Sequence, residues 1–289
     1  LKKVYNLMNK LKKIALLTRA RRDNFFLERW MNYYGPQIGF ENIYIYLDGK
    51  DQDPPQDPTG KVHIELCDRI PGNLDTMEGK RLSFLSDKAA ELFAAGYEVV
   101  IGCDADEYIV VEPRLGMNLA EYISSLNIKT SVSGLGFDVG QRQGVEETFD
   151  YSKGFLAQRH YALIAPDYTK PCIITKPVRW GSGFHRIKGH NYHIDPNLYT
   201  FHFGGFDFEF LKERCMNSDL KNHGWEKHLE FRTRTISLIS QSEPLKGDKI
   251  IRKAQFIQKW FRPPYKWNRS SMLNQLWVYE IPERFWNVV

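Results

Sequence analysis

Hydrophobic positions in the first part of the chain form short continuous runs that alternate with longer, periodic segments. The short runs predict buried strands at Lys12–Thr18, Ile43–Leu47, Lys61–Leu66 and Glu98–Gly102. Apolar residues at helical spacing predict a helix that ends at Gly35-Pro36 and a second helix over Gly79–Gly96. The order strand–helix–strand–strand–helix–strand is typical of a parallel sheet with crossover helices. We therefore expect a Rossmann-like α/β fold, with a mostly parallel central sheet flanked by helices.

The pattern after residue 112 is less regular. Helices are predicted at Asn118–Leu126, Phe208–Asn217 and Trp225–Ser240, and strands at Thr130–Val139, Gly154–Ala165 and Cys172–Trp180. The polar stretch from Gly140 to Ser152 is expected to be a loop. The last residues, 246–289, combine aromatic and basic side chains and are expected to form a helical, aromatic extension to the main domain.

Three acidic residues follow the predicted strand Glu98–Gly102 directly: Asp104, Asp106 and Glu107. The carboxyl edge of an open α/β sheet is where such folds bind ligands. Alternate strand residues share a face, so Asp104 and Asp106 can point at one hard cation, which prefers oxygen ligands. A solvated acidic turn is the alternative interpretation. Neither a G-x-G-x-x-G nor a P-loop fingerprint is present, so a bound nucleotide would need a metal and side chains to hold its phosphates.

Composition and charge narrow the class of protein. The 289 residues are 42% hydrophobic and 14% aromatic, which suits a large folded domain. Four scattered cysteines, no run of about 18 apolar residues and no signal-peptide pattern lead us to expect a cytoplasmic protein. The net charge of +5 comes from the two ends, since residues 1–22 carry eight Lys or Arg and residues 246–269 carry eight more. Basic ends are able to meet a nucleic acid, an anionic membrane or a phosphate-bearing ligand.

An ordered series of motifs resembles a known family. Asp104-Ala-Asp-Glu-Tyr-Ile109 looks like the DxD motif of GT-A glycosyltransferases, in the form D-x-D-E-[FY]-[IL] of the bacterial family-2-like branch. Thr18–Trp30 and Gly39–Asp48 are similar to the first strand and helix and to the second strand of that branch. Lys176-Pro-Val-Arg179 and Phe201-His202-Phe203 resemble its downstream K-P-x-[VI]-R and H-[YF] elements. The likeness extends over roughly residues 12 to 215.

The resemblance implies a divalent cation, Mn²⁺ or Mg²⁺, between the protein and the diphosphate of a nucleotide-sugar. It suggests that Asp106 binds the metal, and that Asp104 serves the sugar or ribose and shares in metal binding. His202, at the H-[YF] position, is expected to be a third metal ligand, with His185 as the fallback. The alternative for His202 is a histidine at the edge of the core. No zinc-finger cysteines accompany these histidines, so a structural zinc site is not expected.

Further residues are expected at the nucleotide-sugar pocket. Thr18 and Arg19 end the first predicted strand and Asp48 ends the second, so all three would lie at one sheet edge. Arg81 is expected to reach the diphosphate, and Lys176 of the K-P-V-R element is expected to join the donor site. For each strand-end or helix-end residue, an ordinary surface polar side chain is the alternative.

An inverting transfer needs a general base on the acceptor side. Asp138, after the fifth predicted strand, is our candidate, and Glu146 and Glu147 lie in the loop beyond it. Residues 1–245 are expected to form a GT-A-like catalytic domain, with a nucleotide-sugar half at about 12–112 and an acceptor half at about 113–245.

The sequence thus predicts a metal-dependent glycosyltransferase that uses a nucleotide-sugar and a glycan or lipid-linked acceptor in cell-surface polysaccharide synthesis. The basic ends would allow peripheral contact with the inner face of the membrane. Solvated charges at the ends and tail aromatics packed on the core are the plainer interpretation, which we prefer for the aromatics. A nucleotidyltransferase or metal-dependent phosphohydrolase is one rival. A non-enzymatic nucleic-acid or membrane binder is the other, but no nucleic-acid motif supports nucleic-acid binding.

Overall fold

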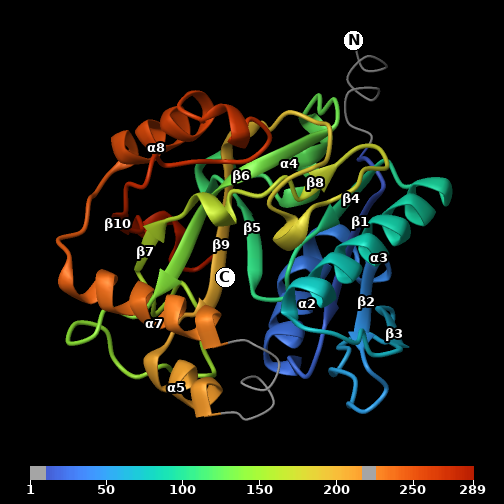
Figure 1. Ribbon diagram of the computed structural model, residues 1–289, viewed down its shortest axis with the longest axis horizontal. Coiled ribbons are helices and arrows are strands. Elements are labelled where there is room, and N and C mark those ends of the chain that lie inside the picture. The colour runs from blue at the N-terminus through green and yellow to red at the C-terminus, as the bar shows by residue number, and fades with distance from the viewer. Residues whose placement is uncertain (1–10, 217–225) are drawn as a thin grey trace.

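A computed structural model describes residues 11–216 and 226–289 of the chain (Figure 1). The basic positions Lys2, Lys3 and Lys10, and the predicted helix ends at Asn217 and Trp225, lie outside the described residues. No described helix has the length and apolar content that a membrane span requires.

The first part of the chain folds as the hydrophobic pattern predicts. Its elements are β1 (Ile14–Ala20), α2 (Asn24–Ile38), β2 (Ile43–Asp48), β3 (His63–Cys67), α3 (Leu74–Ala94) and β4 (Val99–Gly102). The strands pair in the order β3-β2-β1-β4, and all three pairings are parallel. Helix α3 packs on β1 and β4, and the Asn73 side chain caps it by accepting a hydrogen bond from the Thr76 amide. The Rossmann-like order of this half is therefore confirmed.

The predicted helix end at Gly35-Pro36 is wrong. Helix α2 continues through Pro36 to Ile38, and Tyr34, Gly35 and Ile38 are all buried. A Cβ atom on Gly35 would lie 2.3 Å from the Phe40 ring, so the glycine is required by this close packing and not as a helix stop. Burial of the last turn outweighs the proline, whose local preference is to break a helix.

The rest of the sheet is mixed, so the expected mostly parallel sheet describes only the first half. Its elements are β5 (Glu107–Val111), α4 (Leu119–Ser125), β6 (Ser131–Gly140), β7 (Tyr161–Ile164), β8 (Ile173–Ile174), β9 (Ile194–Gly205), α5 (Phe208–Met216), α7 (Glu226–Gln241), α8 (Asp248–Trp260) and β10 (Trp277–Glu280). Strand β8 joins the halves by pairing antiparallel with both β4 and β6. Strand β9 pairs parallel with β6 and antiparallel with β5.

Three features of this half differ from the predictions. The strands expected at Gly154–Ala165 and Cys172–Trp180 shrink to four and two residues. Strand β9, twelve residues long, was not predicted, although it carries the H-[YF] element. The C-terminal segment contributes β10, which pairs with β7 at the end of the sheet, so part of the tail belongs to the core (Figure 1). Helix α7 packs on β6, β7 and β9, and α8 packs on β9.

Candidate active site

The acidic turn lies between β4 and β5, at the carboxyl edge of β1, β2 and β4. The Asp104 carbonyl accepts a hydrogen bond from the Glu107 amide, and the Asp106 carbonyl accepts one from the Phe203 amide of β9. The turn, which follows β4, is therefore fixed to β5 and β9. This is the edge at which open α/β sheets bind ligands.

Two cations bind the Asp104 carboxylate. The Arg81 guanidinium lies 2.8 Å from Oδ1, and Lys170 Nζ lies 2.9 Å from Oδ2. Lys170 also donates to Glu107 Oε1. Burial alone would raise the pKa of Asp104, but Lys170 and Arg81 outweigh burial and hold that pKa well below its usual range. Burial, with the Asp104 charge, raises the pKa of Glu107 to about 7 against the effect of Lys170.

A carboxylate–imidazole–carboxylate chain runs beside this cluster. His202 Nδ1 lies 2.7 Å from Asp138 Oδ1, and His202 Nε2 lies 3.2 Å from Asp106 Oδ2. The Tyr168 ring stacks on the imidazole at a centroid distance of 3.8 Å. Burial lowers the pKa of His202, but the charge of Asp106 and the bonds to both carboxylates raise it to about 9. The raised pKa favours the protonated imidazole, in which Nδ1 donates to Asp138 and Nε2 faces Asp106.

Helix α7 closes the other side of the acidic turn. Arg232 Nη2 lies 3.4 Å from Asp106 Oδ2, and the Thr235 hydroxyl donates to Asp138 Oδ2 over 3.0 Å. The two residues are three positions apart, so they project from one face of the helix. Burial would raise the pKa of Asp106, but His202 and Arg232 hold it below its usual range.

The expected nucleotide side of the site forms a second buried network. The Arg19 guanidinium lies 2.6 Å from Asp48 Oδ1, and Arg69 pairs with the other oxygen of that carboxylate. Thr18 is buried in β1, and its hydroxyl has no hydrogen-bond partner within the described residues. Arg81 connects the two networks, because it binds Asp104 and lies 3.5 Å from the Arg19 carbonyl. Most predicted donor-side residues thus meet at one sheet edge.

The structure places Lys176 elsewhere. Its side chain is exposed, and it follows β8. Because β8 runs antiparallel to β4, Lys176 emerges beside the start of β4, whereas the acids follow the end of β4. The lysine that lies beside Asp104 is Lys170, which precedes β8.

The structure buries Asp138, our candidate for the general base. The side chain is 1% exposed, and its two oxygens are bound by His202 and Thr235. Both Asp138 oxygens therefore contact side chains of the described chain. Glu146 is likewise engaged, since it accepts hydrogen bonds from the backbone amides of Arg142 and His160.

Sequence reasoning did not find Lys170, Tyr168, Arg232 or Thr235 as site residues. Lys170 is 66 positions from Asp104, and Arg232 is 126 positions from Asp106. The one local sign of these site residues was the spacing of Arg232 and Thr235, three positions apart on a predicted helix. That spacing does not show against which strands the helix packs. Gly204 allows Arg232 and His202 to come this close to Asp106. A Cβ atom at position 204 would lie 2.6 Å from the Arg232 guanidinium and from His202 Nε2.

The residues fit a divalent cation in part. No three His, Cys, Asp or Glu side chains of the described residues gather closely enough to hold a metal. Asp106 Oδ2 and His202 Nε2 are nevertheless adjacent, and Asp138 fixes the other imidazole nitrogen, as carboxylates commonly do for metal-binding histidines. Mg²⁺-like ions typically take one or two protein ligands and leave the remainder to substrate phosphates and water. Both oxygens of Asp104, by contrast, are bound by cations.

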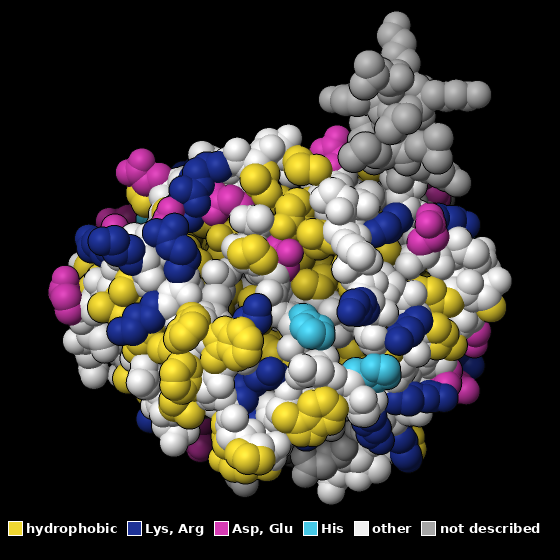
Figure 2. Space-filling model, turned by 90° about the horizontal axis from the view of Figure 1, so that it is seen from above, with side chains coloured by type: hydrophobic (Ala, Val, Ile, Leu, Met, Phe, Trp, Pro, Cys, Tyr) yellow, Lys and Arg dark blue, Asp and Glu magenta, His cyan; other side chains and the backbone are white. Residues whose placement is uncertain are grey.

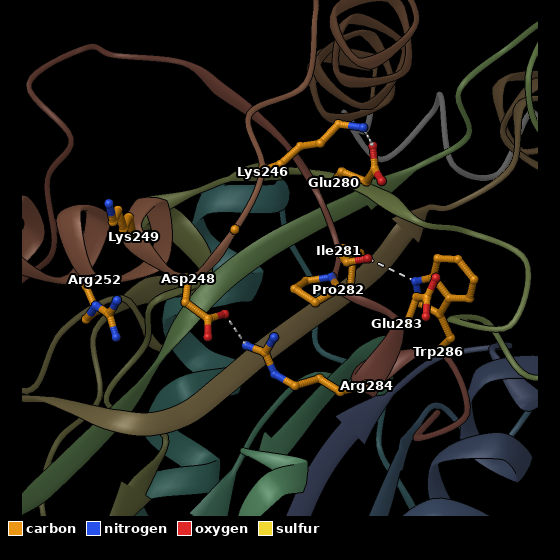
Figure 3. Close-up of a pocket in the computed structure, with 11 residues that line it drawn as sticks. Lys246, Asp248, Lys249, Arg252, Glu280, Ile281, Pro282, Glu283, Arg284 and Trp286 are labelled. Atoms are coloured by element: carbon orange, nitrogen blue, oxygen red, sulfur yellow. Dashed lines mark hydrogen bonds and ion pairs between the residues drawn. The ribbon is translucent and has the colours of Figure 1, made fainter.

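Two cavities lie apart from this cluster and share no lining residue with it. One, of about 480 Å³, lies between the start of α8 and the segment 280–286 (Figure 3). Lys246 pairs with Glu280 and Arg284 pairs with Asp248 along its wall. The other, of about 690 Å³, is lined by residues that include Arg29, Tyr108 and Val289.

Comparisons with known proteins give no family. No family model matches the sequence, and no curated protein matches it significantly. Among solved structures, it is similar to the crystal structure of mannose-1-phosphate geranyltransferase from Thermus thermophilus, with 13% sequence identity and a TM-score of 0.29. The match covers 78% of this chain and 64% of that chain, so this chain spans less than two thirds of the other's length. A likeness this weak carries no argument about activity.

Proposed function

We propose that this protein is a GT-A-like glycosyltransferase that moves a sugar from a nucleotide-sugar to a hydroxyl of a glycan or lipid-linked acceptor. One observation carries the proposal. His202, oriented by buried Asp138, faces Asp106 at the carboxyl edge of the parallel strands, with Arg232 beside the same carboxylate. Such a pair would hold a divalent cation, and the adjacent guanidinium suits a diphosphate.

The charges around the acidic turn match the needs of the leaving group. When the sugar–oxygen bond to the diphosphate breaks, negative charge develops on the departing nucleoside diphosphate, and fixed positive groups lower the barrier by stabilising it. Arg232, Arg81 and Lys170 are the cations beside the two aspartates. Asp106 and His202 would hold Mn²⁺ or Mg²⁺, which supplies further neutralisation as a Lewis acid. To bind a metal, His202 must be neutral, so it must first lose the proton that the neighbouring Asp106 carboxylate stabilises.

The remaining residues position the two substrates. Arg19 and Asp48, at the ends of β1 and β2, would contact the nucleoside, together with Thr18. The acceptor oxygen forms the new bond to the sugar and passes its proton to water, and we propose inversion at that carbon. In this proposal Asp138 is a positioning residue, because His202 and Thr235 bind its two oxygens.

The test replaces the two proposed metal-site residues and measures nucleoside diphosphate release from UDP-, GDP- and dTDP-sugars with and without Mn²⁺. One nucleotide class should give turnover, and thermal stabilisation by that class should need the metal. Asp106→Asn and His202→Gln should each lower turnover by about a hundredfold or more, because each removes a group fixed at the developing charge. Asp87→Asn, an exposed carboxylate on α3 paired with Arg179, is the matched control and should leave turnover unchanged.

A parallel assay addresses the rival chemistry. The same protein is given nucleoside triphosphates with sugar 1-phosphates, and pyrophosphate and inorganic phosphate are measured. Release of pyrophosphate or phosphate that depends on Asp106, with no turnover of any nucleotide-sugar, would overturn the glycosyltransferase proposal in favour of a nucleotidyltransferase or a phosphohydrolase.

A further inference from the structure

Helix α8 carries large aromatic side chains on its outer face. Ile251, Ala254 and Ile257 face the core and are buried. Phe256 and Trp260, which lie on the opposite side of the helix at a spacing of four residues, are 55% and 66% exposed. A surface helix normally has polar residues on that side. The outer face of α8 therefore exposes two aromatic side chains that the packing of the domain does not require.

Basic residues flank these aromatics. Arg252 and Lys253 lie on the preceding turn, and Lys259 lies beside Trp260 with its Nζ 5.3 Å from the ring centroid. Within residues 11–216 and 226–289, none of these three cations makes a salt bridge to an acidic side chain. In Figure 3, Arg252 projects from α8 with no dashed contact to the other labelled side chains, whereas Asp248 is engaged by Arg284. The positive charge of this face is thus not neutralised by the described chain.

The exposed aromatic surface continues past the helix. The Phe261 ring lies 5.7 Å from that of Phe256 and is 49% exposed. Tyr265 and Trp267 follow and are 75% and 47% exposed. Figure 2, which views the molecule from the side on which α8 lies in Figure 1, has hydrophobic side chains next to Lys and Arg side chains on this face. We call Arg252, Lys253, Phe256, Lys259, Trp260 and Phe261 the α8 surface.

We propose that the α8 surface binds the surface of an anionic lipid bilayer. Aromatic side chains partition to the headgroup level of a bilayer, and flanking Lys and Arg side chains are attracted to acidic lipids. A helix lying along a membrane needs this combination of exposed aromatics and unneutralised positive charge. The charge complementarity between the three basic side chains of the α8 surface and acidic headgroups identifies the partner.

Two other occupants fit less well. A second copy of the chain in a symmetric dimer would place this basic rim against itself, because a two-fold interface repeats the same patch on both sides. A single-stranded nucleic acid would be held in a basic groove with stacking platforms. The α8 surface is instead the outward side of a helix packed on β9.

The test uses the full chain with vesicles of phosphatidylcholine alone or mixed with phosphatidylglycerol, and measures the bound fraction by sedimentation. We expect binding to the acidic vesicles that weakens as salt is added. Trp260→Ser with Phe256→Ser should weaken binding by roughly tenfold or more, because two aromatic side chains would no longer insert into the bilayer. Lys253→Glu with Lys259→Glu should also weaken it by more than about tenfold. In vesicles with brominated acyl chains, Trp260→Phe should keep binding and lose part of the tryptophan quenching.

Matched controls change equally exposed residues elsewhere. Val145→Ser, and Lys61→Glu with Lys153→Glu, should leave binding unchanged. Each variant has its thermal midpoint measured, so that unfolding is not taken for loss of binding. The proposal is overturned if acidic vesicles bind wild type and the α8-surface variants equally, or do not bind at all. It is also overturned if the α8-surface changes leave vesicle binding intact but abolish dimerisation or binding to single-stranded DNA.

Discussion

At the scale of single residues, the site depends on side chains that restrain one another. Asp138 restrains His202, His202 faces Asp106, and Lys170 connects Asp104 to Glu107. Such buried ionic groups are tolerated because each is paired, and removal of one partner leaves the other desolvated and unpaired. The positions of these groups are therefore sensitive to small changes next to them.

Gly204 is the most direct case. Its replacement by alanine would place a Cβ 2.6 Å from both His202 Nε2 and the Arg232 guanidinium, and would push these groups away from Asp106. We expect Gly204→Ala to lower turnover about a hundredfold, as displacements of this size do. Gly205→Ala is the control, because its Cβ would come no nearer than 3.3 Å, to the Arg232 Cβ. Equal activities of the two variants, measured with the preferred nucleotide-sugar, would contradict the prediction.

His185 lies near the site and carries a second residue-scale prediction. Burial lowers the pKa of His185 to about 4, with Lys170 and Arg269 acting in the same direction. The carboxylates that face it oppose this shift: Asp167 and Asp104. Its Nδ1 is buried with no hydrogen-bond partner within the described residues. The folded protein therefore takes up this proton less readily than the unfolded chain does.

The sign of the pH effect follows from this lowered pKa. The unfolded chain protonates a histidine near its ordinary pKa of about 6.5, whereas folded His185 stays neutral until near pH 4, so acidification through this window destabilises the fold. We expect His185→Gln to lose less thermal stability than wild type between neutral pH and about pH 5. Identical pH dependence of wild type and His185→Gln would refute the prediction.

At the scale of elements, the direction in which each strand runs decides which side chains reach the site. The parallel strands β1, β2 and β4 bring their ends to one edge, which the sequence pattern predicts. Strand β8 reverses direction, so Lys170 before it meets Asp104 and Lys176 after it does not. A two-residue strand has no periodicity from which its direction could be read.

The tail provides an element-scale prediction. Phe285 is buried against the rings of Tyr199 and Phe201, with centroid distances of 5.1 and 5.5 Å. Phe285→Ala should lower the free energy of unfolding by about 3–5 kcal/mol, the usual cost of emptying a buried aromatic site. Phe256→Ala, on the exposed face of α8, should change it by less than about 0.5 kcal/mol. Urea unfolding of the two variants measures the difference, and similar values would show that the tail does not support the core.

At the scale of the whole molecule, the tail has two roles that its composition does not separate. Val278, Tyr279 and Phe285 complete the core next to β7 and β9. Trp260 and Phe261 remain on the outside. The expectation that the tail aromatics pack on the core is therefore correct for one group and wrong for the other. The buried and the exposed tail residues are of similar types in the sequence. Only the packing of α8 on β9 separates the two groups.

The sequence by itself determined the order of strands and helices up to β4 and the position of Asp104 and Asp106 after β4. These features depend on local periodicity and on the rule that the ends of neighbouring parallel strands meet. The tertiary structure decided the rest: that Lys170 and Arg232 reach the two aspartates, that Asp138 holds His202, and which side of α8 stays exposed. These contacts join segments far apart in the chain, so they depend on the path of the backbone and leave no periodic pattern in the sequence.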